Sequence, residues 1–297
     1  MPLFDAYLFV DWSARKVLGP AVPTADGIWV GELMLDGDVS DECYFRGRDA
    51  AVAYVEDRLR RHLRSQHRVL IGFDFAYGYP SGLARALGLP VDRHAWWTVW
   101  TELCHRVTDG PENQSNRFQA AAGLNRILGN GKGGGPFWGV PAKQATSILH
   151  AGSPGFPFVA DGGMELERLR LTERRLPGVQ ETWKLYGAGS IGSQALVGIP
   201  YLHRLRRHPT FVHHSTVWPF ETGFTSAPTM GRRPFLVHAE VWPGVLKDSV
   251  AKVVAADEGT IKDQIQVREL CRWAAKIDRS ANLGELFDTP PDLSPEQ

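Results

Sequence analysis

Acidic side chains stand near the ends of the most apolar segments of this sequence. Residues 6–12 (AYLFVDW) carry Asp11, and residues 69–75 (VLIGFDF) carry Asp74. Short apolar runs bounded by polar or turn-forming residues predict buried strands. When such strands are parallel neighbours, their carboxyl ends meet at one edge of a sheet, where α/β proteins form ligand sites. We therefore expect Asp11 and Asp74 to lie close together at such an edge.

Three further acids are candidates for the same edge. Glu221 lies in VWPFET, Glu240 lies in AEVWP, and Asp263 falls in the first turn of the last expected helix. Glu221 and Glu240 compete for one role, which the sequence does not assign. Each acid also has a local alternative, because acidic side chains cap free backbone amides and are favourable in the first turn of any helix.

Such a cluster of carboxylates has a specific chemical use. Buried carboxylates repel one another and lose hydration unless a cation neutralises them. A hard divalent ion, Mg²⁺ or Mn²⁺, prefers oxygen ligands, and two ions about 4 Å apart suit in-line attack of water on a phosphodiester. The expected metal ligands are Asp11, Asp74, Glu221, Glu240 and Asp263, of which Asp11, Asp74, Glu240 and Asp263 are the expected catalytic residues.

The first ninety residues show how the sheet would position these acids. Three apolar strands with a turn at Asp36-Gly37-Asp38 predict a meander, and Asp49 is expected to cap the helix that follows. A strand after that helix is most simply parallel to its neighbour in a covered sheet. The expected elements are strands over 6–12, 27–35 and 41–46, a helix over 49–65 and a strand over 69–75.

The rest of the chain divides into an insertion and a second part of the core. We expect an α/β protein with a core over 1–90 and 185–297 and a helical, glycine-rich insertion over 91–184. In the insertion, Trp96, Trp97 and Trp100 fall at helical spacing, which favours core packing over base stacking. The remaining expected elements are helices over 92–128 and 164–176 around an irregular segment over 129–163, then a helix over 192–208, strands over 211–221 and 234–243, and a helix over 260–277.

Composition excludes several classes of protein. The 297 residues carry 33 Lys and Arg against 33 Asp and Glu, so the net charge is zero, which argues against a surface that binds polyanions everywhere but leaves local basic patches open. Three distant cysteines indicate reduced thiols. No apolar run approaches the length of a membrane span, and the N-terminus lacks the pattern of a secretory signal. We expect a cytoplasmic protein without membrane contacts; its oligomeric state is left open.

Other polar and glycine-rich segments are candidates for substrate contacts. The segment Gly187–Gly192 is a literal GxGxxG, but no acid lies between it and Glu221, which disfavours a dinucleotide site. Its amides remain suited to one phosphate, or the segment forms only a tight turn. A basic segment over 204–214 is expected beside the acidic edge, where it contacts phosphate or merely ends a helix. The candidate substrate-binding residues are Lys132, Asn116, Arg117, Gly189, Ser190 and Arg207.

The order of strands and acids is similar to that of the ribonuclease H superfamily. More narrowly, it resembles the predicted nucleases grouped as domain of unknown function 429. The matching positions are Asp11, then Asp74 with Gly78 and Pro80, then Glu240 with Pro243, then Asp263. This sequence departs from the group's pattern at Trp12-Ser13-Ala14, where glycines are usual, at Ala76, where proline is usual, and at Asp263, which lacks a paired aspartate.

The resemblance implies a ribonuclease H-like fold and a Mg²⁺- or Mn²⁺-dependent nuclease or phosphodiesterase. Its partner would be nucleic acid or a phosphorylated small molecule. Two alternatives stay open. One is a non-catalytic ribonuclease H-like domain that binds a nucleotide, a cofactor or a protein at the same edge. The other is a transferase in cobalamin or molybdopterin metabolism, as some related chains are labelled, although no residue here supports that label.

Overall fold

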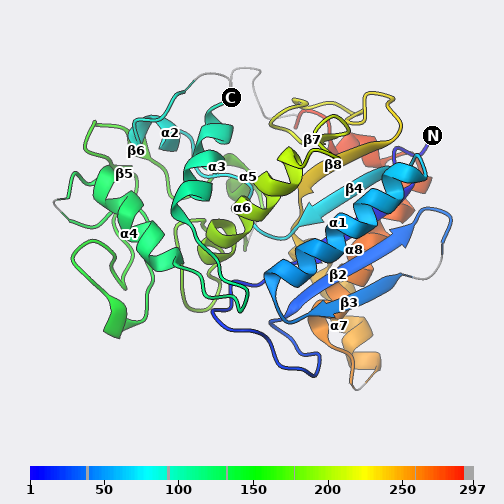
Figure 1. Ribbon diagram of the computed structural model, residues 1–297, viewed down its shortest axis with the longest axis horizontal. Coiled ribbons are helices and arrows are strands. Elements are labelled where there is room, and N and C mark those ends of the chain that lie inside the picture. The colour runs from blue at the N-terminus through cyan, green and yellow to red at the C-terminus, as the bar shows by residue number, and fades with distance from the viewer. Residues whose placement is uncertain (38–39, 92–93, 132, 177, 258, 291–297) are drawn as a thin grey trace. The chain divides into compact units, whose positions relative to one another are not determined.

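The computed structural model describes residues 1–37, 40–91, 94–131, 133–176, 178–257 and 259–290 (Figure 1). The expected turn residue Asp38 and the candidate Lys132 lie outside these ranges. The chain forms two compact units, one from Met1–Asp74 and Arg204–Gln297, the other from Phe75–His203. The second unit is larger than the expected insertion over 91–184, because residues 75–90 and 185–203 belong to it.

A mixed sheet of six strands forms the centre of the first unit. Its order is β3-β2-β1-β4-β8-β7. The first three strands form the predicted antiparallel meander, whereas β4, β8 and β7 run parallel to β1. The α/β class and the parallel pairing of the strand near residue 70 are therefore confirmed. The strands are β1 (Ala6–Asp11), β2 (Ile28–Met34), β3 (Asp41–Phe45), β4 (Arg68–Phe73), β7 (Ser215–Val217) and β8 (Phe235–Glu240).

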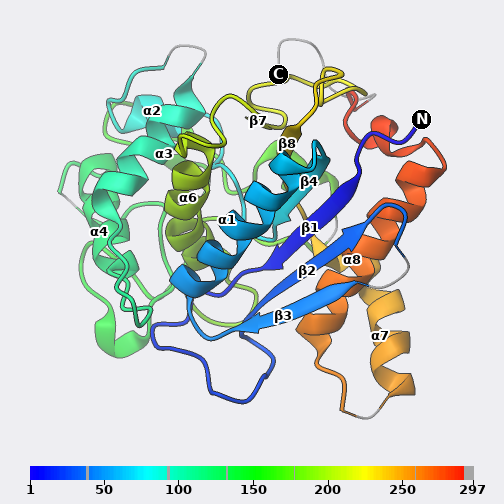
Figure 2. The same cartoon turned by 45° about the vertical axis from the view of Figure 1, so that its right-hand side comes forward.

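Long helices cover both faces of this sheet (Figures 1 and 2). Helix α1 (Arg48–Arg64) packs against β2 and β4, and α8 (Lys262–Arg279) packs against β1 and β2. Helix α7 (Lys247–Ala256) and the 3-10 turns η2 (Pro243–Leu246) and η3 (Leu283–Leu286) pack around α8. Helix α1 begins after Gly47, so Asp49 lies in its first turn and not at the expected N-cap.

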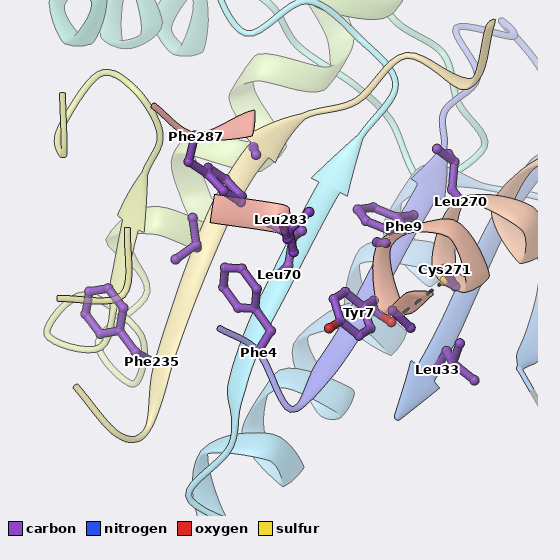
Figure 3. Close-up of a cluster of buried hydrophobic side chains, with 14 residues drawn as sticks. Phe4, Tyr7, Phe9, Leu33, Leu70, Phe235, Leu270, Cys271, Leu283 and Phe287 are labelled. Carbon is purple, nitrogen blue, oxygen red and sulfur yellow. Dashed lines mark hydrogen bonds between the residues drawn. The ribbon is translucent and has the colours of Figure 1, made fainter. Parts of the chain in front are cut away.

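The core between the sheet and α8 fixes which strand residues face that helix (Figure 3). Tyr7 and Phe9 of β1 and Leu70 of β4 belong to this core, together with α8 residues such as Leu270 and Cys271. Because side chains alternate along a strand, residues at even spacing from these face α8 as well. On β8 the residues of this face are Phe235, Val237 and Ala239.

The regular elements of the second unit are mainly helices, separated by long irregular segments. The expected charged helix over 164–176 is wrong for most of its length: Leu166 is fully buried in a short hairpin, and the helix begins only at Leu171. Trp100 is fully buried and contacts Trp96 and Trp97, so these side chains pack together as expected. The elements are α2 (Leu83–Ala86), α3 (Ala95–Arg106), α4 (Arg117–Leu128), η1 (Ala142–Gln144), β5 (Phe158–Val159), β6 (Glu165–Leu166), α5 (Leu171–Arg175) and α6 (Gly192–Arg207), whose last turn belongs to the first unit.

The predicted strand over 211–221 is also shorter in the structure. Before β7, the Phe211 amide donates a hydrogen bond to the His208 carbonyl and the His214 amide donates to the Phe211 carbonyl, which forms turns. After β7, a hydrogen bond from the Glu221 amide to the Val217 carbonyl forms another turn. In the described ranges, no helix combines the length and apolar character needed to cross a membrane.

Candidate functional site

Asp11 and Asp74 leave neighbouring parallel strands at the same edge of the sheet. Val10 of β1 is paired with Phe73 of β4. Asp11 follows the first of these residues and Asp74 follows the second. The Asp74 amide donates to the Val10 carbonyl at 3.1 Å, and Asp74 Oδ1 accepts from the Trp12 amide at 2.7 Å. Asp11 follows Tyr7 and Phe9 at two-residue spacing and therefore lies on the α8 face.

Asp11 is buried and Asp74 is half-buried, and the pKa values of both carboxyls are raised. Burial raises the pKa of Asp11 well above its ordinary value, and the charges of Asp74 and Asp263 raise it further. Burial likewise raises the pKa of Asp74 to about 7, against the lowering effect of the Trp12 amide, and a hydrogen bond with Asp11 also favours its carboxylate. A hydrogen bond between two carboxyls requires a proton, and this proton belongs to the pair as a whole.

A third carboxyl approaches this pair from α8. Asp263 lies in the first turn of the helix, and its Oδ2 accepts from the Asp26 amide at 2.7 Å. Burial raises the pKa of Asp263, and the charge of Asp26 adds to this. The structure therefore brings together three of the expected acids: Asp11, Asp74 and Asp263.

Gln266, which is not among the residues predicted from the sequence, connects two of these acids. With its side-chain nitrogen turned toward them, it donates to Asp263 Oδ1 at 3.2 Å and to Asp11 Oδ2 at 3.3 Å. It stands three residues after Asp263, so both side chains share one face of α8. This spacing predicts a shared helix face, but it does not by itself mark Gln266 as a site residue. Asp26, which no expected element contained, could not have been found from its neighbours in sequence.

Glu240 reaches the same edge of the sheet but not the same face. It is paired with Phe73, one residue before Asp74. Because Ala239 faces α8, the alternation of β8 turns Glu240 to the opposite face. The structure therefore does not group Glu240 with the three aspartates.

Glu221 has a different partner. Its two carboxylate oxygens accept from Arg206 Nε and Nη2, both at 2.8 Å, and Oε2 also accepts from the Val217 amide. This bidentate ion pair satisfies the carboxylate locally. Arg207 follows on α6, at the end of the sheet where β7 and β8 begin, so the basic segment over 204–214 does not lie beside the acidic edge as expected.

Four expected substrate-binding residues belong to the second unit. Asn116 bonds to the Thr108 amide and the Arg106 carbonyl, and Arg117 donates to the hydroxyls of Ser115 and Ser193. Gly189 has a positive φ of 69°, and the Ser190 amide bonds to Gly187 in a turn before α6. The segment is thus a tight turn at a helix start.

The carboxylate pair fits a divalent ion that is only partly held by protein. Among the described residues, no group of three or more His, Cys, Asp or Glu side chains is arranged to hold a metal ion. Mg²⁺ usually takes one or two carboxylates and completes its shell with water and substrate phosphate. Asp11 and Asp74 supply that number, and the pKa of each is raised chiefly by burial.

Comparison with family models, with curated proteins and with solved structures found no match for this chain.

Proposed function

We propose that the first unit has a ribonuclease H-like fold and acts as a divalent-metal-dependent nuclease or phosphodiesterase. The fold proposal is supported by the strand order β3-β2-β1-β4, by α1 between β3 and β4, and by the parallel strand β8 beside β4. The resemblance of the sequence to that superfamily rests on the same elements.

The observation that carries the activity is the hydrogen-bonded pair Asp11 and Asp74 at the ends of adjacent parallel strands. A divalent ion bound there would supply a polarised water and neutralise charge on a phosphodiester. The Trp12 amide orients Asp74, and Gln266 orients Asp11 relative to Asp263. The proton held between Asp11 and Asp74 must leave when a cation binds, so affinity for the ion should increase with pH.

A second candidate is a domain that binds a phosphorylated ligand at this edge without hydrolysing it. Among the described residues, Asp263 does not complete a three-ligand metal group with Asp11 and Asp74, which favours a weaker or substrate-completed site. The two candidates differ in turnover and not in the first binding step.

The experiment is isothermal calorimetry with Mn²⁺ on the wild type, Asp11→Asn and Asp74→Asn, with Asp248→Asn as the matched control. Asp248 is an exposed acid in the first turn of α7. We expect micromolar binding to the wild type and the control, and at least about tenfold weaker binding to each site variant, because one of two carboxylate ligands is lost. Equal binding by all four folded proteins would overturn the proposal.

Activity is then measured on DNA, on RNA and on bis(p-nitrophenyl) phosphate. Metal-dependent cleavage that both site variants lose supports the nuclease. Metal binding without cleavage of any of these supports the second candidate.

A further inference from the structure

We propose that the end of the sheet where β4, β7 and β8 begin is a binding surface for the phosphate backbone of nucleic acid. It lies opposite the end of the sheet that carries the aspartates. This basic edge consists of Arg60, Arg64, Arg207, His208, Arg232 and Arg233. The choice of nucleic acid rests on the proposed nuclease function, whereas the anion-binding character rests on the edge itself.

Three separate chain segments build the basic edge. The end of α1 meets the segment after α6, where Arg60 Nη2 lies 3.1 Å from His208 Nε2. It also meets the loop before β8, because Arg233 Nη1 donates to the Gln66 carbonyl at 3.2 Å. Basic residues in the last turn of a helix stabilise that helix, which accounts for Arg64 of α1 and Arg207 of α6. This effect does not account for Arg232 and Arg233, which come from a loop.

Acidic side chains neutralise only part of this edge. Arg60 pairs with Glu56, and Arg233 pairs with Asp5. Within the described ranges, Arg64, Arg207 and Arg232 have no ion pair, and all three are exposed. In a chain with no net charge, this local excess must be balanced elsewhere on the surface.

The arginines of the loop are held in place before any ligand binds. Arg232 Nη2 donates to the His213 carbonyl at 2.8 Å, and its guanidinium lies 4.8 Å from the ring centre of Phe235. Ordered side chains lose less entropy on binding than free ones. Five of the six residues of the basic edge are arginines, and the planar guanidinium bonds to phosphate oxygens in pairs.

A lipid surface is a poorer fit. Membrane-binding faces combine basic residues with exposed apolar ones. Here Phe211 and Phe235 are buried, and the described segment between β7 and β8 exposes two large apolar side chains, Phe224 at 39% and Met230 at 58%.

The distance between the basic edge and Asp74 sets a minimum length for a substrate that contacts both. The basic edge lies where β4 begins, and Asp74 follows the other end of this six-residue strand. At about 3.3 Å per residue the two sites are about 20 Å apart. A duplex rises about 3.4 Å per base pair, so a substrate must have at least about six base pairs to contact both.

The test measures the salt dependence of binding by fluorescence anisotropy, in EDTA so that no cleavage occurs. The probes are labelled DNA and RNA duplexes of about 20 base pairs, titrated between about 50 and 200 mM salt. The variant is Arg64→Gln, Arg207→Gln, Arg232→Gln. The matched control is Lys247→Gln, Lys252→Gln, Lys276→Gln, three exposed cations on α7 and α8.

We expect the slope of log K against log salt to shrink by about 3 in the variant and to be unchanged in the control, since each lost phosphate contact contributes about 0.9. Because Arg232 supports a loop, the double variant Arg64→Gln, Arg207→Gln is measured as well, with an expected reduction of about 2. No binding by the wild type, equal losses in variant and control, or binding of phosphatidylserine vesicles in place of nucleic acid would each overturn the inference. Binding through this edge without cleavage in Mg²⁺ would leave the surface established and the nuclease refuted.

Discussion

Replacing Asp74 by asparagine should stabilise the metal-free protein at neutral and alkaline pH. In the folded state the pKa of Asp74 is raised from 3.8 to about 7, chiefly by burial. Between these two values the folded protein holds a proton that the unfolded chain has released. The free energy of unfolding therefore falls as the pH rises through this window. Asparagine cannot ionise, and its side-chain oxygen can still accept from the Trp12 amide.

The magnitude follows from the two pKa values. The gap between 3.8 and about 7, at about 1.4 kcal/mol per pH unit, gives a cost of about 4 kcal/mol once the carboxyl is ionised. We expect Asp74→Asn and the wild type to be nearly equal at about pH 4 and to diverge steadily to about pH 7. Mn²⁺ should then stabilise the wild type at pH values above 7 and stabilise the variant less at the same Mn²⁺ concentration, because the variant binds the ion more weakly.

The assay is urea unfolding across this pH range in EDTA, with Asp248→Asn as the control. His238 also titrates, but with the opposite sign: burial lowers its pKa to about 3, so it adds stability as the pH rises to about 6.5. That contribution is common to all three proteins and cancels in the difference between them. Parallel stability curves for the wild type and Asp74→Asn would refute the reasoning, because they would mean that Asp74 ionises in the fold as easily as in water.

Two further predictions concern buried polar groups outside the site. His238 is fully buried, and neither ring nitrogen has a hydrogen-bond partner among the described residues. His238→Leu should therefore raise the free energy of unfolding by about 2 kcal/mol at neutral pH, measured by urea unfolding. A loss of stability would show that a bound water satisfies the ring. Asp278 accepts hydrogen bonds from the amides of Leu3 and Phe4 and from the Tyr7 hydroxyl. Asp278→Ala should therefore lower the free energy of unfolding by about 3 kcal/mol, and Tyr7→Phe by about 1 kcal/mol. Equal losses in the same assay would contradict this prediction.

The parts of the fold that could be predicted are those determined by local pattern. The apolar runs around Asp11 and Asp74 identified two strands and, through the helix between them, their parallel pairing. The predicted strand over 211–221 was too long. The turns between His208 and His214 depend on tertiary packing, which the apolar content of the segment does not encode. The same limit applied to the helix over 164–176, where burial of Leu166 in a hairpin outweighed helical periodicity.

The candidate site was predictable to a similar extent. Strand ends identified Asp11 and Asp74, and the helix start identified Asp263. The face on which Glu240 lies depends on its register with β4, which only the assembled sheet defines. Gln266 depends on how α8 crosses β1, because a glutamine three residues from an acid has no distinctive chemistry until a second carboxyl approaches it.

The net charge of zero conceals a separation of charge along the parallel strands. Carboxyls gather where β1 and β4 end, and unpaired arginines gather where β4, β7 and β8 begin. A polyanion is attracted to the second end without any metal, whereas the first end repels it until a cation is bound. Binding and cleavage should therefore depend on different variables: affinity on salt and on Arg64, Arg207 and Arg232, and turnover on Mg²⁺ or Mn²⁺ and on Asp11 and Asp74. If EDTA removed binding as completely as it removed cleavage, the two ends would not act separately, and the metal itself would have to be the main contact with the substrate.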